Sequence, residues 1–323
     1  MRLLVTGGAG FIGSTFVKLS LKAGNHLTVF DALTYAGNMK NLQTVERSKA
    51  FEFIHGDVCN LKELEQAIEG AEAIVHFAAE SHVDRSINNP SPFISTNCLG
   101  VANLCELALK YETPKVIHIS TDEVYGSIEN KINGLSFCEE DPLNPSSPYS
   151  SSKAAGDLIA LSYHQTYDLP ISIVRPSNAY GPFQYPEKII PLSITNFLDG
   201  KTVPLYGDGL NVRDWCHVED TCDAIEIVLE KGVSGSIYNA GASNEMTNID
   251  LLNKLLEICE TDSSLIDYVA DRQGHDRHYS IDSTKMRSIG WSPSREFEQG
   301  LEDTVKWYRD NRLWWEPLRN SPK

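Results

Sequence analysis

Gly7-Gly8-Ala9-Gly10-Phe11-Ile12-Gly13 follows directly on an apolar run at residues 2–6 that predicts a buried strand. A helical pattern begins within this stretch and stops at Gly24, and a second apolar run at residues 27–30 ends at Asp31. Glycines in this spacing let the backbone approach a pyrophosphate, the helix N-terminus stabilises its charge, and the acid can accept a ribose hydroxyl. Because these parts occur in the required order, we predict a dinucleotide site, and the acid favours NAD over a 2′-phosphorylated cofactor.

The first half of the chain continues to alternate between strand and helix. Apolar runs predict strands at residues 51–55, 72–77, 115–120 and 171–175, and helical patterns lie at residues 61–68, 91–111 and 148–167. Such alternation is typical of an α/β fold with a parallel sheet. We therefore predict a Rossmann-type doubly wound parallel sheet within residues 1–176.

The pattern becomes less regular after Pro176. Helices are predicted near residues 219–231, 249–259 and 296–311, and a strand at residues 236–240, whereas residues 262–280 are polar. Arg, Tyr and His are frequent at the predicted turns, as expected of a segment that covers a substrate. We expect residues 177–323 to form mainly a smaller C-terminal substrate-binding domain, with parts of residues 210–240 returning to the first domain.

The composition excludes several classes of protein. The chain has 323 residues and a formal net charge of -16, which argues against nucleic acid or an anionic membrane as a partner, because both attract basic patches. No apolar run approaches the roughly 18 residues of a membrane span, and no signal peptide is expected before the first strand. The seven cysteines form neither a Cys-x-x-Cys pair nor a zinc-type cluster, so we expect no metal and reduced thiols in a cytoplasmic protein.

Two adjacent carboxylates follow the predicted strand at residues 115–120. Asp122 and Glu123 would therefore lie at the carboxyl edge of a parallel sheet, where ligands bind in this class of fold. If one carboxyl group holds a proton while its neighbour accepts one, the pair can act as acid and base. The alternative is that both acids cap the turn that follows.

Tyr149 and Lys153 lie four residues apart at the start of a predicted helix and therefore share a face. An ammonium group near a phenol favours the phenolate, which would make Tyr149 a base for a sugar hydroxyl. A hydroxyl group such as that of Ser120 or Thr121 could share this hydrogen bond. Taken without its context, the same spacing is more often a surface pair.

Asp84 and Arg85 follow the predicted strand at residues 72–77, close to the same edge of the sheet. They could contribute to the ligand site or form a surface ion pair.

Several motifs in combination resemble the extended short-chain dehydrogenase/reductase superfamily, and within it the dTDP-glucose 4,6-dehydratase family. They are GGAGFIG at 7–13, DALTYAGN at 31–38, AAESHVDRS at 78–86, TDEVYG at 121–126, Tyr149-x-x-x-Lys153, PEKIIP at 186–191, YGDG at 206–209, RDW at 213–215, GHD at 274–276 and WWEPL at 314–318. The resemblance covers nearly the whole chain. Its specific part is the Asp-Glu pair directly after Thr121, because the related epimerases lack it.

The resemblance implies roles for five residues. Tyr149, aided by Lys153 and Thr121, would take the proton of the C4 hydroxyl while the C4 hydride goes to NAD. Glu123 would remove the C5 proton and Asp122 would protonate the C6 hydroxyl, so that water leaves. The hydride would then return to C6, giving a 4-keto-6-deoxy sugar and regenerating the cofactor.

The resemblance also implies a binding site, a substrate and an assembly. The expected cofactor-binding residues are Gly7, Gly10, Phe11, Ile12, Gly13, Asp31, Asp57, Val58, Phe77, Ala78, Ala79, Ser81, Thr96, Tyr149 and Lys153. The expected substrate-binding residues are Ser81, Thr121, Asn178, Lys188, Arg213, Asn248, His275 and Tyr279. The substrate would be a nucleotide sugar, and the family is typically homodimeric through the helices predicted at residues 91–111 and 148–167.

Three readings of the function remain open at this point. The first is dehydration of dTDP-glucose to dTDP-4-keto-6-deoxy-glucose. The second is a 4,6-dehydratase or a C4 epimerase that acts on another nucleotide sugar such as UDP-glucose, since a single methyl group separates the two bases. Ala179 bears on this choice because the family often has Asn at that position. The third is an NAD-binding sensor without catalysis, which Tyr149 and Lys153 argue against.

Overall fold

The computed structural model describes residues 1–130 and 136–319. Its strands are β1 (Arg2–Thr6), β2 (His26–Asp31), β3 (Phe51–His55), β4 (Ala73–His76), β5 (Val116–Ile119), β6 (Ile171–Pro176), β7 (Asn178–Tyr180), β8 (Val203–Tyr206), β9 (Val212–His217), β10 (Ile237–Ala240), β11 (Glu245–Thr247) and β12 (Ile266–Val269). Its α-helices are α1 (Phe11–Lys22), α2 (Leu61–Ile68), α3 (Val83–Asn88), α4 (Ser91–Ile94), α5 (Gly100–Lys110), α6 (Pro148–Tyr167), α7 (Ile189–Leu198), α8 (Val218–Lys231), α9 (Asn248–Ile258), α10 (Thr284–Ser288), α11 (Phe297–Asp310) and α12 (Arg312–Arg319). The remaining short helical turns are η1 (Met39–Leu42), η2 (Ser95–Leu99), η3 (Asp122–Tyr125), η4 (Ile128–Asn130) and η5 (Ser263–Leu265).

Seven strands form one parallel sheet in the order β10-β6-β5-β4-β1-β2-β3. The strand order reverses between β1 and β4, so the loops after these two strands diverge and open a crevice at the carboxyl edge. The predicted Rossmann-type doubly wound parallel sheet is therefore confirmed.

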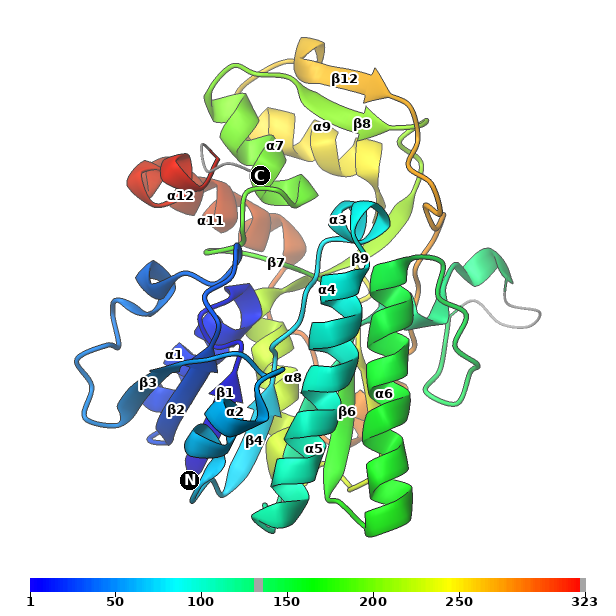
Figure 1. The fold of residues 1–323 in the computed structure, drawn as a ribbon. Coiled ribbons are helices and arrows are strands. Elements are labelled where there is room, and N and C mark those ends of the chain that lie inside the picture. Colours follow the sequence, from blue (N-terminus) through cyan, green and yellow to red (C-terminus); the bar gives the residue numbers. More distant parts are fainter. Residues whose placement is uncertain (131–135, 320–323) are drawn as a thin grey trace.

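Helices cover both faces of this sheet (Figure 1). Apolar side chains of α1 and α8 pack on one face, and those of α2, α5 and α6 pack on the other. The strands β1, β4 and β5 are buried along nearly their whole length, which explains why each appears in the sequence as a continuous apolar run. Helix α8 and strand β10 come from the later half of the chain, and β10 pairs in parallel with β6.

Local sequence fixes the N-terminus of α6, which carries two of the predicted catalytic residues. Ser147 caps the helix by accepting from the Ser150 backbone N–H, and the Ser150 hydroxyl accepts in return from the Ser147 N–H. Pro148 occupies the first helical position, where its missing N–H costs nothing. Tyr149 and Lys153 therefore lie in the first turns of α6, at the end that meets the carboxyl edge of the sheet.

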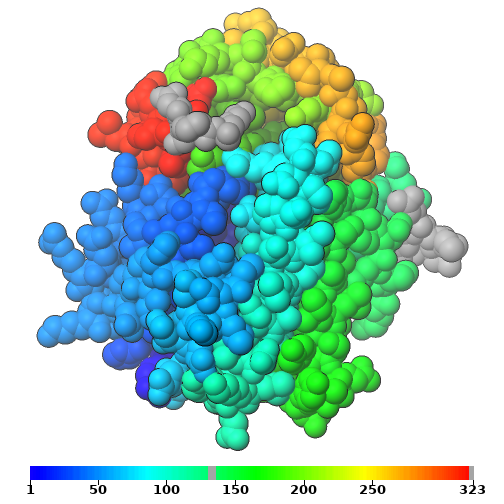
Figure 2. All heavy atoms as spheres, viewed as in Figure 1, coloured from blue at the N-terminus to red at the C-terminus, as the bar shows by residue number. Residues whose placement is uncertain are grey.

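The remaining elements form a second lobe built on β7, β8, β9, β11, β12, α7, α9, α11 and α12. Its core consists of Leu, Ile and aromatic side chains that include Trp215, Tyr308 and Trp315. Figure 2 shows this lobe, coloured yellow-green, orange and red, seated on the upper end of the blue-to-green first lobe. The carboxyl edge of the parallel sheet is therefore covered by the second lobe.

The structure differs from the expectation in several details, of which two lie within segments that the sequence analysis described. The helix predicted at residues 91–111 is divided by a π-helical turn, η2, and residues 262–280 contain strand β12, which pairs with β8. Within residues 1–130 and 136–319, no helix has both the length and the apolar character needed to cross a bilayer.

Candidate functional site

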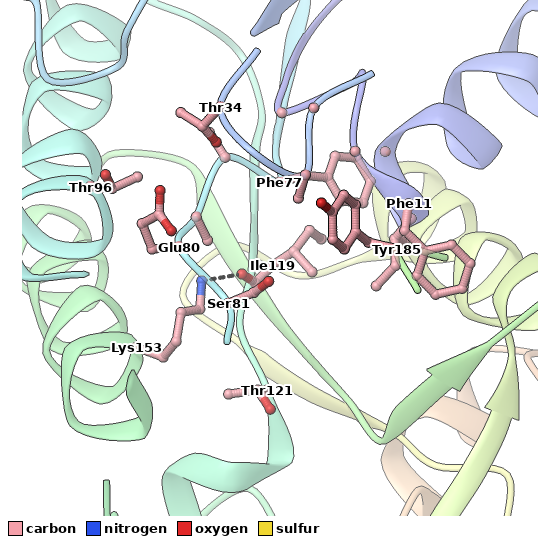
Figure 3. Close-up of a pocket in the computed structure, with 18 of the residues that line it drawn as sticks. Phe11, Thr34, Phe77, Glu80, Ser81, Thr96, Ile119, Thr121, Lys153 and Tyr185 are labelled. Carbon is pink, nitrogen blue, oxygen red and sulfur yellow. Dashed lines mark hydrogen bonds between the residues drawn. The ribbon is translucent and has the colours of Figure 1, made fainter. Parts of the chain in front are cut away.

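A cavity of about 300 Å³ lies at the carboxyl edge of the sheet, between the two lobes. All fifteen predicted cofactor-binding residues and all five predicted catalytic residues line it. Figure 3 shows that Phe11 and Phe77 stand at one end of the cavity, whereas Lys153 and Thr121 stand at the other. The glycine-rich loop and the acidic pair therefore face one continuous space.

The glycines of the loop after β1 are required by close backbone contacts. Gly7 has a φ of +68°, and a Cβ atom placed on it would lie 2.5 Å from the backbone nitrogen of Ala78. A Cβ atom on Gly13 would lie 2.3 Å from the carbonyl oxygen of Gly7. Side chains at these positions would push the loop away from β4 and α1, so the loop presents bare backbone to the cavity, as a pyrophosphate requires.

Asp31 is buried at the end of β2 with each carboxylate oxygen held by a backbone N–H. Oδ2 accepts from Ala9 (2.9 Å) and Oδ1 accepts from Leu33 (2.8 Å). Burial raises the pKa of Asp31, and these two hydrogen bonds oppose the rise. Each oxygen retains a lone pair, so the carboxylate can also accept from a ribose hydroxyl in the cavity. The glycine-rich loop and Asp31 thus fit an NAD molecule.

The acidic pair lies in η3, directly after β5. Thr121, and neither acid, caps this turn: its hydroxyl oxygen accepts from the Glu123 backbone N–H (3.3 Å). The same hydroxyl donates to Oδ1 of Asp122 (3.2 Å). Among the described residues, Oδ2 of Asp122 is buried without a hydrogen-bond partner. The capping alternative for the two acids is therefore wrong, and a buried carboxyl oxygen remains available to a ligand.

The environment acts differently on the pKa values of the two carboxyl groups. Burial raises the pKa of Asp122 well above its usual range, and the negative charges of Glu123 and Asp214 raise it further. Desolvation in the cavity also raises the pKa of Glu123, but the positive charges of Lys188 and Arg213 oppose this rise. A neutral carboxylic acid at Asp122 beside a carboxylate at Glu123 is the arrangement that an acid and base pair needs.

Tyr149 and Lys153 are both buried, at 8% and 3% relative exposure. The ammonium group of Lys153 donates to the carbonyl oxygen of Ile119 (2.7 Å), as Figure 3 shows. Burial lowers the pKa of Lys153 to about 8. It raises the pKa of Tyr149, as does the charge of Glu123, whereas a hydrogen bond with Thr121 lowers it.

The expectation that Lys153 lowers the pKa of Tyr149 is not met in this structure. The lysine charge is directed to the end of β5, and burial beside Glu123 dominates at the phenol. The expected role of Thr121 as a hydrogen-bond partner of the phenol is consistent with the site, since Thr121 lies between Tyr149 and Asp122.

The predicted substrate-binding residues fall into two groups. Ser81, Thr121, Asn178 and Lys188 line the cavity, whereas Arg213, Asn248, His275 and Tyr279 do not. Within the second group, Arg213 stacks on the ring of Tyr279 with 4.1 Å between the guanidinium carbon and the ring centroid. The charge of Arg213 nevertheless acts on Glu123, so this pair lies next to the cavity wall.

The other two residues of the second group are held by protein contacts. His275 interacts with Asp271 at 2.6 Å and lies edge-on to Tyr206. Asn248 begins α9, and its backbone N–H donates to the carbonyl oxygen of Asn211 (3.0 Å). Both residues lie in the second lobe and are not among the residues that line the cavity.

Asp84 and Arg85 do not pair with each other. Arg85 donates to Glu187 (3.1 and 3.2 Å), and Asp84 pairs with Arg272 at 3.4 Å. These two ion pairs join α3 to two segments of the second lobe, so the surface-pair alternative is wrong.

The sequence analysis missed Arg272, Glu187 and Tyr185. The charge of Arg272 lowers the pKa of Glu123, and the other two residues line the cavity. An arginine two residues before the GHD motif was the signal for Arg272, and Glu187 lies within the PEKIIP motif.

Comparisons with known proteins agree with this geometry. A family model described as GDP-mannose 4,6 dehydratase matches residues 4–304. A dTDP-glucose 4,6-dehydratase of Streptomyces niveus is 47% identical over 99% of this chain and 96% of its own length. A dTDP-glucose 4,6-dehydratase of Streptomyces antibioticus is 48% identical over 100% of this chain and 96% of its own length.

Solved structures give the same picture. The dTDP-glucose 4,6-dehydratase of Streptomyces venezuelae, crystallised with NAD and TYD bound, superposes with a TM-score of 0.95 at 50% identity, covering 98% of this chain and 100% of its own. A Thermus thermophilus UDP-glucose 4-epimerase in complex with NAD gives a TM-score of 0.88 at 30% identity, covering 96% of this chain and 100% of its own. These dehydratases therefore share more sequence with the chain than this epimerase does.

Proposed function

Because this chain belongs to the dTDP-glucose 4,6-dehydratase family, we propose that it converts dTDP-glucose to dTDP-4-keto-6-deoxy-glucose with bound NAD. The reaction is the elimination of water, so the enzyme is a lyase. The single observation that carries this proposal is the adjacent pair of the buried Asp122 and the partly buried Glu123, which lines a cavity that fits a dinucleotide together with Tyr149. An enzyme that only oxidises a hydroxyl group has no use for a second and third proton-transfer group.

Tyr149 is the base for the C4 hydroxyl in this proposal. NAD, when bound, supplies the acceptor for the C4 hydride and later returns it to C6. Tyr149 exchanges a hydrogen bond with Thr121, so the phenol is oriented toward the acidic pair before the sugar arrives. Lys153 lies one helical turn further along α6, and its buried ammonium group can stabilise negative charge that develops nearby.

Glu123 and Asp122 carry out the elimination. Oxidation at C4 acidifies the C5 proton, which Glu123 removes as a carboxylate. Asp122 protonates the departing C6 hydroxyl, because burial raises its pKa and so favours the carboxylic acid form. The positive charges of Lys188 and Arg213 support this division, since they favour the ionised form at Glu123.

The diphosphate of the substrate would bind near Lys188, Arg213 and Arg272. The positive charges of all three act on Glu123, so all three lie in the vicinity of this residue, where they would attract a dianionic group. Lys188 already donates to the carbonyl oxygen of Ser81 (2.7 Å), which fixes its direction. We assign the remaining predicted contacts to the sugar and the base: Ser81, Thr121, Asn178, Asn248, His275 and Tyr279.

A homodimer is the proposed assembly. Apolar side chains are exposed along the helices predicted to pair. Leu158 on α6 is 60% exposed, and Ile94 and Leu99, which precede α5 in the chain, are 58% and 50% exposed. Replacing Leu158 with Glu should shift the sedimentation coefficient toward that of a monomer. Val233→Glu, which changes another exposed apolar residue (63%), should leave the assembly unchanged and serves as the control.

We propose a cytoplasmic location. No disulfide joins any of the residues that the structure describes, which is consistent with a reducing compartment.

Mass spectrometry of the products, combined with NMR to distinguish isomers of equal mass, tests the proposed reaction. The protein is incubated separately with dTDP-glucose and UDP-glucose. The proposal predicts loss of one water molecule from dTDP-glucose without net accumulation of reduced nicotinamide. Faster dehydration of UDP-glucose would assign the other base, conversion to a galactose isomer without loss of water would indicate an epimerase, and no conversion with NAD bound would indicate a sensor.

A further inference from the structure

Ala9 lies in the middle of the glycine-rich loop, and both its backbone N–H and its backbone carbonyl oxygen are hydrogen-bonded. Its N–H donates to Asp31 (2.9 Å). Its carbonyl oxygen accepts from the side-chain amide of Asn41 (2.9 Å) and from the backbone N–H of Asn38 (3.0 Å). The conformation of the loop is therefore set partly by η1, a turn about thirty residues later in the chain.

Asn41 is in turn oriented by Trp314. The indole Nε1–H of Trp314 donates to Oδ1 of Asn41 (2.9 Å), and Asn41 is only 2% exposed. An indole N–H can only donate, and a backbone carbonyl can only accept. Trp314 therefore holds the amide oxygen of Asn41 on its own side and directs the NH₂ group to Ala9. Without Trp314 the amide would lose the partner that fixes this orientation.

Trp314 belongs to α12, in the second lobe, which lies above the blue N-terminal segment in Figure 1. Its ring contacts Trp307 edge-on with centroids 5.1 Å apart, and Phe183 with centroids 5.7 Å apart. Phe183 directly precedes Gln184 and Tyr185, which line the cavity. The same indole thus joins the cofactor loop to a wall of the substrate site.

We propose that Trp314, acting through Asn41, is a positioning residue that holds the glycine-rich loop in the conformation that retains NAD. This inference rests on the proposed function, since a tightly held cofactor is needed when the hydride must return within each turnover. The WWEPL motif at 314–318 acquires a role in this way, because its first tryptophan reaches the cofactor loop.

The test uses Trp314→Phe, which keeps an aromatic ring and removes the N–H donor. Trp315→Phe is the matched control: Trp315 is the next residue of α12, is 1% exposed, and donates its own N–H to the Tyr308 carbonyl oxygen (2.7 Å). Both variants lose one buried hydrogen bond, but only the first lost bond leads to the cofactor loop. The dissociation constant of NAD is measured by calorimetry on protein stripped of cofactor, together with hydrogen exchange of peptides that cover residues 7–13.

We expect Trp314→Phe to raise the dissociation constant of NAD about fivefold, the change expected from one net hydrogen bond, and to speed exchange in the loop. Trp315→Phe should change neither, and saturating NAD should restore the kcat of Trp314→Phe. Equal NAD affinity in the two variants would overturn the proposal. If Trp314→Phe fails to fold, Asn41→Ala decides: it must weaken NAD binding to a similar degree.

The double variant Trp314→Phe/Asn41→Ala separates positioning from packing. Because the two residues act along one path, their combined effect on NAD affinity should be smaller than the sum of the single effects. Additive effects would contradict the path. A wild-type protein that binds NAD but forms no 4-keto-6-deoxy product would refute the proposed function. The effect of Trp314 on NAD binding would still be decided by the affinity measurements.

Discussion

Asp122 and Glu123 are adjacent residues of one turn, and the charge of Glu123 raises the pKa of Asp122. Asp122 is also buried, and its Oδ2 lacks a hydrogen-bond partner among the described residues. Nearby positive charges instead favour the ionised form of Glu123. The surroundings of the two neighbouring acids therefore differ: burial and a neighbouring negative charge both favour the protonated form of Asp122, whereas positive charges oppose the rise in the pKa of Glu123. This asymmetry agrees with the proposed roles of Asp122 as the proton donor and Glu123 as the proton acceptor of the elimination.

Glu123→Gln should stop the reaction after oxidation at C4. Glutamine has nearly the same shape but cannot remove the C5 proton, so turnover should fall by about 10²–10⁴-fold. In a single-turnover experiment, the absorbance of reduced nicotinamide should appear and persist, because the hydride has left C4 and has no acceptor at C6. Normal formation of the 4-keto-6-deoxy product would contradict the role of Glu123.

Asp122→Asn should stop the reaction one step later. Glu123 still removes the C5 proton, but the C6 hydroxyl leaves without a proton donor, so elimination should slow by about 10²–10⁴-fold. Deuterium from the solvent should then enter C5 of the bound sugar faster than water is lost. In Glu123→Gln the same exchange should be absent, so the two variants act as controls for each other.

Tyr149→Phe should block the first step while leaving the fold intact. The phenylalanine ring can keep the edge contact with Phe93, whose centroid lies 6.3 Å from that of Tyr149. No reduced nicotinamide should form, and NAD should still bind. Appearance of reduced nicotinamide at the wild-type rate would mean that another group takes the proton of the C4 hydroxyl.

Lys153 should make stability depend on pH in a defined direction. Its pKa is about 8 in the folded protein, below the value of 10.5 for an exposed lysine, so its burial costs stability below about pH 8. The cost disappears as the pH rises from about 8 to 10.5, because the folded protein releases the proton at a lower pH than the unfolded chain does. The advantage of Lys153→Met over wild type in free energy of unfolding should therefore decrease between pH 7 and pH 10, by at most about 3 kcal/mol.

Denaturant titrations of the two proteins at both pH values measure this difference. Comparing the free energy of unfolding of each protein at the two pH values removes effects that do not depend on pH, such as loss of the hydrogen bond to the Ile119 carbonyl oxygen. A difference that stays constant or grows with pH would show that Lys153 is not held with a lowered pKa.

Much of the fold could be predicted from sequence because the relevant signals are local. The buried strands appear as apolar runs, and the capping Ser147 and Pro148 mark the start of α6 at the predicted residue. By contrast, β12 was missed because its Asp267 and Tyr268 are exposed and give no apolar run. The π-helical turn at Ser95–Leu99 also has no local signal.

The cavity-lining parts of the site followed from motifs, but its electrostatics did not. Arg272 and Asp84 are 188 residues apart and meet only through the arrangement of the two lobes. The direction of the Lys153 ammonium group depends on the end of β5, which sequence spacing cannot supply. The contact of Trp314 with Asn41, 273 residues away, likewise depends on tertiary structure alone.

Internal transfer of hydride from C4 to C6 is the central claim, and deuterium labelling tests it most directly. The enzyme is incubated with dTDP-glucose that carries deuterium at C4, and the product is examined by mass spectrometry and NMR. The account predicts loss of one water molecule and deuterium in the C6 methyl group. Deuterium that is lost to solvent, is retained at C4, or accumulates in free reduced nicotinamide would contradict it.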